Sequence, residues 1–504
     1  MATLISQLFH TAKTTPAQTA IVFQDASISY LQLEDAVRRL ANGLSSLEIQ
    51  KGDRVAILLP NVPHFCISYY ATLAIGAIAV PLNFLLDSEE LVYQYNDCGA
   101  KCLITWQGFE KQALLLEKKA SDLQKIIMLG NRIPRSMVPL TRLIADSAPL
   151  EQAVNADEQD IAVINYTSGI ADEALGAELS HSAIAYNSAT IAEMFRVSHN
   201  ERFLAVLPLF HAFGQTFLMH TCFTTGSTMV LSPCFKAEVV LETIQNHGIT
   251  VLSAVPGMFR AFLDLDGDTY SLTSLKYSIC YGGHLPEDIL REFEQKFDTK
   301  IYKAYGLTEA GPLVSIARSE HDRDASSVGF PLMGVEVQIR DDFGDVLAPN
   351  QSGEIYIKSP SQMTGYYGHV EETKSRLVDG WLASGDIGYL DINHHLFIQE
   401  RKDDIIIKGG FQIHSREIEQ ILLDHPQVDE VAVVAVPDAM HGSEAKAFIV
   451  LKDESQVDAA ELESYCQNVL PVYKCPKFIE VVARLPKSAT GKVLKRNLRL
   501  ICQS

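Results

Sequence analysis

The sequence has 504 residues, enough for two or more domains with a substantial buried core. Hydrophobic residues make up 47% and charged residues 21% of the chain, which is typical of a globular protein. The formal net charge of −20 repels phosphate backbones and anionic lipids, so nucleic acid and membrane surfaces are not expected as general partners. A local basic patch for a small anionic cofactor is still compatible with this charge.

Cysteine use and the N-terminal sequence both predict a cytoplasmic protein. The nine cysteines are an odd number and include no CxxC pair. Cys98 and Cys102 lie four residues apart, but no second pair accompanies them, so reduced thiols are a better interpretation than a metal site. The first twenty residues lack the long apolar core and cleavage site of a signal peptide.

The first long apolar stretch, residues 55–86, contains no Asp, Glu, Lys or Arg. Three prolines interrupt it, and proline ends or kinks helices, so no transmembrane segment is predicted. We predict a buried strand–helix–strand unit instead, with its elements at Val55–Leu59, His64–Ala74 and Ile78–Pro81.

Short β-branched runs then alternate with helical patterns, as at Ile249–Leu252, Lys276–Cys280 and Pro286–Phe297. This alternation predicts an α/β fold with a large multi-layer N-terminal domain and parallel-rich sheets. The charge run ERKDD at 400–404 follows a predicted strand at His395–Gln399 and is either a domain boundary or a solvated turn. The remainder suits a compact α+β unit of about 100 residues.

The segment KAYGLTEAG, residues 303–311, places an aromatic, a glycine, a threonine and a glutamate close together. Tyr305 is suited to stack on a planar base, and Thr308 to donate a hydrogen bond to a phosphate. Glu309 offers carboxylate oxygens to a hard cation such as Mg²⁺. Without further context, the same residues form an ordinary loop with a capping threonine.

Three more segments contain candidate site residues. Asp386, after a glycine, is suited to accept two hydrogen bonds from a ribose diol, or is a turn residue. Lys492, in LPKSATGKVLKRNLR, offers a mobile point charge to a phosphate or carboxylate, or belongs to a basic tail. His211, in LPLFHAFGQ, is either a functional group or a satisfied core histidine.

Taken together and in this order, the segments resemble the adenylate-forming superfamily, the acyl-CoA synthetases and their relatives. The resemblance runs from about Tyr30 to Arg499. The matching segments are YTSG, PLFH, CYGGHLP, YGLTE, SVGFP, GEIYIKSP, GYYG, SGDIGYLD, ERKDDIIIKGG, VAVVAVPD, YKCPK and TGK. Each would be weak alone, but so many in one order are very improbable by chance.

The resemblance implies a ligase that uses ATP, Mg²⁺ and coenzyme A. A carboxylate attacks the α-phosphate of ATP and gives an acyl-adenylate plus pyrophosphate. A thiol then attacks the acyl carbon and releases AMP. Catalysis of this kind consists mostly of positioning and of charge neutralisation on the phosphates.

Carried over residue by residue, the resemblance implies an adenosine site. Tyr305 would stack on the adenine, and Gly306 belongs to the same nucleotide-binding set. The pair Gly283 and His284 would contact the adenine edge. Asp386 would hold the ribose hydroxyls, with Arg401 near the ribose and phosphate.

The resemblance also implies a phosphate site and a mobile C-terminal domain. Thr308 would contact the α-phosphate, Glu309 would bind Mg²⁺, and Lys492 would bridge the reacting carboxylate and phosphate. Asp403 falls at the family's hinge, which divides the chain into domains 1–401 and 405–504 with a hinge at 402–404. Rotation of the small domain would bring to the thiol site the residues Lys408, Gly409, Gly410 and Phe411. His211 would lie near the junction of pantetheine and acyl group.

The phosphate-binding loop departs from the family pattern. It begins normally, with Thr167, Ser168 and Gly169. The family continues with Thr or Ser, Thr, Gly, any residue, Pro, Lys and Gly, whereas this chain has Ile170, Ala171, Asp172, Glu173, Ala174, Leu175 and Gly176. Two hydroxyls, one glycine and the lysine are therefore missing, and two carboxylates are added.

The charge change is large enough to matter. A unit charge pair about 5 Å apart is worth roughly 3 kcal/mol at an effective dielectric constant near 20. The altered loop is therefore expected to weaken pyrophosphate binding, with each 1.4 kcal/mol worth about tenfold in affinity. The run Ala171–Leu175 also has better helix formers than a phosphate loop normally contains.

Three interpretations follow for ATP use. The enzyme adenylates a carboxylate slowly or with replacement contacts, or it acts on a ready-made acyl-adenylate or acyl-thioester, or it only binds ligand. Because the other nucleotide residues are all present, we favour the first. The expected substrate is a hydrophobic carboxylic acid, a linear fatty acid before an aromatic one.

The sequence leaves alternatives open for the acceptor of the acyl group and for protein partners. Only twelve residues follow Lys492, so no fused carrier domain is expected. A separate carrier protein is an alternative acceptor to coenzyme A, and a homodimer is an open alternative.

Overall fold

A computed structural model describes residues 3–167, 174–266, 269–409, 411–438, 440–452, 457–487 and 493–502. Spatial contacts divide the chain into two compact units. Unit 1 comprises Met1–Val337 and Ile357–Ala383, and unit 2 comprises Gln338–Tyr356 and Ser384–Ser504. The predicted hinge at 402–404 and the rotation of the small domain remain predictions.

The first sheet of unit 1 is parallel through its centre. In the described part of the chain it has nine strands, in the order β16-β15-β14-β13-β12-β10-β11-β1-β2. Their bounds are β16 Phe330–Pro331, β15 Ser315–Ile316, β14 Ile301–Tyr305, β13 Tyr277–Cys280, β12 Val251–Ala254, β10 Arg202–Ala205, β11 Thr228–Leu231, β1 Thr19–Phe23 and β2 Ala26–Ser29. The neighbours from β14 to β1 are all paired in parallel.

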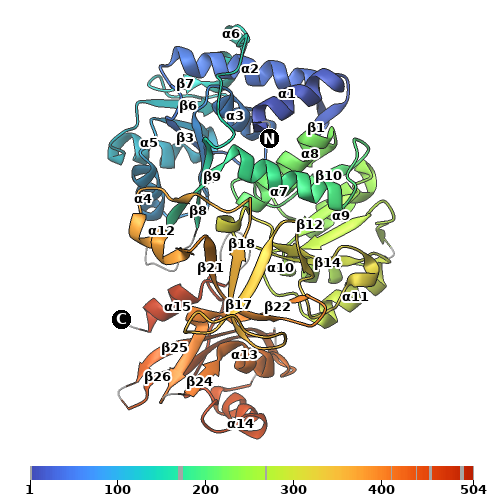
Figure 1. Ribbon diagram of the computed structural model, residues 1–504, viewed down its shortest axis with the longest axis vertical. Coiled ribbons are helices and arrows are strands. Elements are labelled where there is room, and N and C mark those ends of the chain that lie inside the picture. The colour runs from blue at the N-terminus through green and yellow to red at the C-terminus, as the bar shows by residue number, and fades with distance from the viewer. Residues whose placement is uncertain are drawn as a thin grey trace. The chain divides into compact units, whose positions relative to one another are not determined.

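Three helices pack on this sheet, α9 (Ala237–His247), α10 (Pro256–Leu263) and α11 (Glu287–Phe297). Figure 1 shows α9 and α11 in green and yellow beside β12 and β14. Leu241, Phe259 and Phe293 are buried with Leu204 and Leu252 of the strands in one hydrophobic cluster. Burial of such side chains stabilises the layer by about 1.5–3 kcal/mol each.

The second sheet of unit 1 has eight strands among the residues described, in the order β19-β9-β8-β4-β3-β5-β6-β7. Their bounds are β19 Gly365–Tyr366, β9 Leu175–Ser180, β8 Ile161–Thr167, β4 Ile78–Pro81, β3 Arg54–Leu58, β5 Cys102–Trp106, β6 Lys125–Leu129 and β7 Val138–Pro139. The other helical elements of unit 1 include α1 Leu4–Thr14, α2 Tyr30–Ser46, α3 Pro63–Ala74, α4 Ser88–Cys98, α5 Glu110–Lys119, α6 Leu140–Asp146, α7 His181–Met194, the π-helix η2 Gly214–His220, α8 Thr221–Thr225 and α12 Val370–Arg376.

The described residues of unit 2 contain a five-stranded sheet with the order β24-β23-β26-β25, in which β27 pairs with β26. Helices accompany this sheet, so this part of the chain is α+β. These elements are β23 Ile405–Lys408, β24 Phe411–His414, β25 Val428–Asp438, β26 Gly442–Leu451 and β27 Phe478–Val481, with helices α13 Ser415–Leu423, α14 Ala459–Val469 and α15 Lys495–Ile501. A further sheet has the order β17-β18-β21-β20, with β22 on β21. Its strands are β17 Glu336–Arg340, β18 Gly353–Lys358, β21 Trp381–Leu390, β20 Leu377–Val378 and β22 Leu396–Arg401.

The strand–helix–strand unit predicted within residues 55–86 is confirmed as β3, α3 and β4. Pro63 stands at the first turn of α3, where its missing N–H is tolerated. Residues on all sides of α3 are buried, because the helix contacts α1 and α2 as well as β3 and β4. Among the described residues, no helix is both long and apolar enough to cross a membrane. The predicted α/β fold class, with a smaller α+β part, is confirmed.

Unit 1 keeps buried histidines in the neutral form. His220, in η2, lies between Tyr70, whose hydroxyl is 2.7 Å from Nδ1, and Tyr69, whose hydroxyl is 3.3 Å from Nε2. Burial lowers the pKa of His220 to about 3 and that of His181 to about 4. In the unfolded chain both would titrate near pH 6.5.

We therefore predict that acid destabilises the fold. Below pH 6.5 the unfolded chain binds protons that these histidines exclude, so the free energy of unfolding falls by about 1.4 kcal/mol per histidine and pH unit. Urea denaturation between pH 7.5 and 4.5 measures this, and His220→Gln, which cannot titrate, should give a shallower slope. Equal slopes for the wild type and His220→Gln would show that this histidine is not the cause.

Candidate active site

Strand β14 delivers the segment YGLTE to the edge of the first sheet. Tyr305 ends the strand and is 9% exposed. A Cβ atom on Gly306 would lie 1.8 Å from the carbonyl oxygen of Pro312, so only glycine fits the turn. The short helix η4 (Thr308–Ala310) follows, with Thr308 partly exposed and Glu309 buried.

The Glu309 carboxylate has one hydrogen-bond donor among the residues described. Tyr366 in β19 donates its hydroxyl to Oε1 at 2.9 Å. Burial, with the Glu309 charge as the next cause, raises the pKa of Tyr366 far above its usual range, so the phenol stays protonated. A buried carboxylate of this kind fits a hard cation such as Mg²⁺. The sequence contained a signal for Tyr366, the segment GYYG, but it indicated no role.

The predicted adenine-edge residues follow the neighbouring strand. Strands β13 and β14 are parallel, with Cys280 opposite Lys303. Their carboxyl ends therefore lie at the same sheet edge, where ligands of open α/β sheets bind. Gly283 and His284 follow β13 and are exposed, so the structure brings them to the edge that carries Tyr305.

His211 follows β10 at the same edge. Its Nδ1 accepts a hydrogen bond from the Phe213 N–H at 3.2 Å, which places the ring proton on Nε2. Apolar surroundings lower its pKa to about 4, so the ring is neutral near pH 7. The His211 ring centroid is 6.2 Å from that of Tyr281, and Phe213 stacks on Tyr281 at 4.0 Å.

Two buried amides that sequence reasoning missed hold this segment. Asn61 donates to the carbonyls of Ala205 and Leu207 at 2.9 Å each, and its Oδ1 accepts from the Leu209 N–H. Gln215 and Asn165 exchange hydrogen bonds of 3.0 and 3.3 Å, which link η2 to β8. Because these contacts join residues far apart in sequence, no local pattern could have indicated them.

The phosphate-loop prediction falls partly outside the described residues. Ser168, Gly169 and positions 170–173, where the sequence differs from the family pattern, lie outside the described residues. Thr167 ends β8 opposite Leu175, and its hydroxyl donates to the Leu175 carbonyl at 3.5 Å. Leu175, where the family has its lysine, opens β9 and is only 5% exposed. A buried, apolar side chain therefore stands where the resemblance implies a lysine.

In unit 2 the two predicted ribose residues meet. Asp386 in β21 is the cross-strand partner of Arg401 in β22. Arg401 Nε lies 3.4 Å from Asp386 Oδ1, and the aspartate N–H donates to the Ser384 hydroxyl at 3.0 Å. Asp403 lies exposed in η6 (Lys402–Asp404), where its carbonyl accepts from Arg499 at 2.8 Å.

The predicted thiol-site residues lie on the hairpin β23–β24. Lys408 Nζ is 2.7 Å from Glu444 Oε2, and the Gly409 N–H donates to the His441 carbonyl at 2.9 Å. Phe411 is 62% exposed and its ring lies 5.3 Å from that of Tyr473. The predicted residues Gly410 and Lys492 lie outside the described part of the chain.

One group with metal-ligating side chains is present in the described residues, Asp438, His441 and Glu444. Its carboxylates already form ion pairs, Asp438 with Lys477 and Glu444 with Lys408. These ammonium groups neutralise the two carboxylates, and the arrangement ties the β23–β24 hairpin to the β25–β26 turn.

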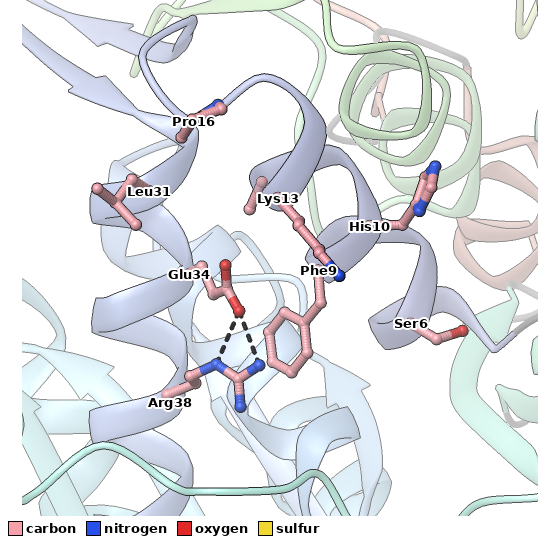
Figure 2. A pocket seen from close by; sticks show the side chains of 9 residues that line it. Ser6, Phe9, His10, Lys13, Pro16, Leu31, Glu34 and Arg38 are labelled. Carbon is pink, nitrogen blue, oxygen red and sulfur yellow. Dashed lines mark hydrogen bonds and ion pairs between the residues drawn. The ribbon is translucent and has the colours of Figure 1, made fainter.

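A pocket of about 560 Å³ lies between α1 and α2 (Figure 2). Arg38 is 2.7 Å from Glu34 and lies 3.9 Å from the centre of the Phe9 ring. None of the predicted site residues lines this pocket. The arginine therefore serves to hold α1 against α2.

Two models of known protein families match the chain. The sequence model of the AMP-binding enzyme family matches residues 8–367, and that of the AMP-binding enzyme C-terminal domain matches residues 417–492. The chain belongs to the AMP-binding enzyme family. The predicted resemblance is thereby confirmed.

Relatives of this AMP-binding enzyme match it over nearly their whole length. A long-chain-fatty-acid–CoA ligase of Bacillus subtilis is 33% identical over 98% of this chain and 94% of its own. A feruloyl-CoA synthase of Amycolatopsis is 32% identical, over 97% and 96%. The structure of o-succinylbenzoate CoA synthetase from Bacillus subtilis with its acyl-adenylate intermediate has a TM-score of 0.88 and 30% identity, over 98% and 97%. The predicted class, an acid–thiol ligase that forms an adenylate, is confirmed.

The Gly306 turn gives a test of the site's geometry. We expect Gly306→Ala to destabilise the enzyme by about 2–4 kcal/mol, because the new methyl group overlaps the Pro312 carbonyl. Loss of AMP binding should accompany it. Gly257→Ala in α10, where nothing lies within 4 Å, is the control and should be neutral or slightly stabilising. Urea denaturation and AMP titration measure both effects, and normal AMP affinity in Gly306→Ala would contradict the assigned geometry.

Proposed function

We propose that this AMP-binding enzyme activates a hydrophobic carboxylic acid as its acyl-adenylate and transfers the acyl group to coenzyme A. The observation that carries the proposal is the shared sheet edge. Parallel strands β10, β13 and β14 bring to it His211, the pair Gly283–His284 and the Tyr305–Glu309 segment. The Asp386–Arg401 pair supplies a separate set of groups suited to a ribose.

In the first step the acid's carboxylate attacks the α-phosphorus and pyrophosphate leaves. Tyr305 stacks on the adenine, and Thr308 donates its hydroxyl to an α-phosphate oxygen. Glu309 would hold Mg²⁺, which when bound neutralises charge on the phosphates. The role that the family resemblance implies for Lys492 is to supply a positive charge to the attacking carboxylate and the phosphate, since two anions must approach each other.

In the second step the thiol sulfur attacks the acyl carbon. The acyl–oxygen bond breaks, AMP leaves with the electron pair, and the thiol proton passes to solvent. Lys408 and Gly409 guide the pantetheine arm, and the small glycine permits a close approach of backbone and ligand. The ring of His211, neutral near pH 7, would add no charge beside the acyl group.

The proposed acid is a linear fatty acid, in keeping with the Bacillus fatty-acid ligase. An aromatic acid is the second candidate, and one observation favours it. Phe213 stacks on Tyr281 at 4.0 Å and on Phe217 at 4.8 Å, so a buried stack of three aromatic rings lies beside His211. Feruloyl-CoA synthase shows that an aromatic acid occurs as substrate among the relatives.

ATP use is the unusual part of the proposal. With Leu175 buried, the phosphates lack a cation worth roughly 3 kcal/mol at about 5 Å. We propose that adenylation proceeds with weakened ATP binding. Use of a preformed acyl-adenylate, transfer to a carrier protein, and ligand binding alone are the alternatives that the following assay separates.

We predict AMP and pyrophosphate release when the enzyme receives ATP, Mg²⁺ and a matching acid from a panel of linear and aromatic acids. Lys492→Ala should reduce adenylation at least a hundredfold, because the two reacting anions lose their shared counter-charge. Lys487→Ala is the matched control, since that lysine is paired with Glu430 at 2.7 Å. Activity should stay normal in the control.

The outcomes separate the alternatives. Pyrophosphate release without acyl-CoA formation would point to a carrier protein as acceptor. Silence across the panel, with acyl-adenylate still converted to acyl-CoA, would reject ATP-dependent activation.

We predict that Asp172→Gly combined with Leu175→Lys lowers the KM for ATP tenfold or more. The substitutions remove a repulsive carboxylate and restore the missing cation. Leu175→Met is the control for a change of packing at this buried position, and it should leave the KM unchanged. An unchanged KM in the double variant would mean that the loop lies away from the phosphates.

A further inference from the structure

The buried partner of Glu309 is Tyr366, a residue to which the sequence assigned no function. Its hydroxyl donates to Glu309 Oε1 at 2.9 Å. The two side chains are only 4% and 5% exposed. A hydrogen bond to a buried carboxylate is strong, so the phenol fixes the orientation of the carboxylate.

The backbones of both residues are held independently of this contact. Tyr366 is the cross-strand partner of Ala177, and its N–H donates to Thr373 Oγ1 at 2.8 Å. The Glu309 carbonyl accepts from the Met363 N–H at 2.7 Å. The hydroxyl and the carboxylate therefore meet from two fixed supports, which is how a site is pre-organised.

A buried arginine acts on the same phenol. Arg376, at the end of α12, is 7% exposed and donates Nη1 to the Ala383 carbonyl at 2.7 Å. Its positive charge opposes the rise in the pKa of Tyr366 that burial and the Glu309 charge cause. In the described part of the chain Glu309 has no ion-pair partner, and its carboxylate meets the phenol of Tyr366 instead. A direct arginine pair would compete with a metal ion for the carboxylate oxygens.

We propose that Tyr366 is a positioning residue, which orients the Glu309 carboxylate toward the divalent cation of a nucleoside triphosphate. The hydroxyl occupies Oε1 and thereby directs the remaining lone pairs to the metal. Arg376 stabilises the phenol in this orientation. The inference rests on the proposed use of Mg·ATP, and it adds two residues to the group that serves it.

The test measures how much Mg²⁺ tightens ATP binding. ATP is titrated calorimetrically into acid-free enzyme, once with saturating Mg²⁺ and once with EDTA. We expect Tyr366→Phe, which keeps the ring, to weaken ATP binding about tenfold with Mg²⁺ and not at all in EDTA. Tyr367→Phe is the matched control, because that neighbouring ring lies near Arg54 and away from this contact, and it should behave as wild type.

A second pair of variants separates an effect on metal binding from a loss of protein stability. Arg376→Met alters neither partner of the hydrogen bond and should weaken Mg²⁺-dependent binding about threefold. In a Glu309→Gln background, Tyr366→Phe should cause no further loss. Titrations are run below the unfolding midpoint of the least stable variant.

Several results would overturn the inference. These are wild-type Mg²⁺ dependence in both Tyr366→Phe and Arg376→Met, an equal loss in EDTA, an equal loss in the Glu309→Gln background, or no ATP binding by the wild type. A silent acid panel combined with the expected ATP titrations would reject the proposed reaction and leave this inference standing.

Discussion

Parallel pairing of β10, β12, β13 and β14 determines where chemistry can occur in unit 1. Parallel strands have their carboxyl ends at one edge, and the segments that follow these strands begin there. His211, the pair Gly283–His284 and Tyr305 reach this edge because their strands are neighbours, although more than ninety positions separate the first from the last in sequence. The sheet core, with Leu204, Leu252 and the helix phenylalanines, thus fixes the site without containing any of its polar groups.

Local patterns in the sequence predicted the helices and strands well where a whole element is buried. The buried unit of β3, α3 and β4 was predicted to within one residue at each of its ends, because a charge-free run punctuated by prolines leaves few alternatives. The nucleotide segment was found because its residues are contiguous. Asn61 and Gln215 were missed because their partners lie far away in the chain, and a lone amide carries no local signal. Tyr366 lies in the segment GYYG, but its role depends on the distant partner Glu309, which no local pattern indicates.

The good helix formers in Ala171–Leu175 were a poor guide to the local structure at the end of this run. Among the described part of that run, Leu175 opens a strand, since its backbone pairs with Thr167 and its side chain is buried. At Leu175, strand pairing outweighs helix propensity. What the sequence did establish is the chemistry of the change, because a leucine side chain has neither the charge nor the hydrogen-bond donors of a lysine.

The lost lysine alters the balance of charges that an anionic substrate meets. Several cations of this acidic chain are already paired, Lys408 with Glu444, Lys495 with Glu419 and Arg401 with Asp386. A paired cation attracts a phosphate less, because its carboxylate repels the same phosphate. A metal ion brought by the nucleotide differs from these groups, since it arrives with a double charge and needs only a well-oriented carboxylate. Under the proposed use of Mg·ATP, a chain without the loop lysine depends more on Glu309, and the buried phenol that donates to Glu309 gains importance for the same reason.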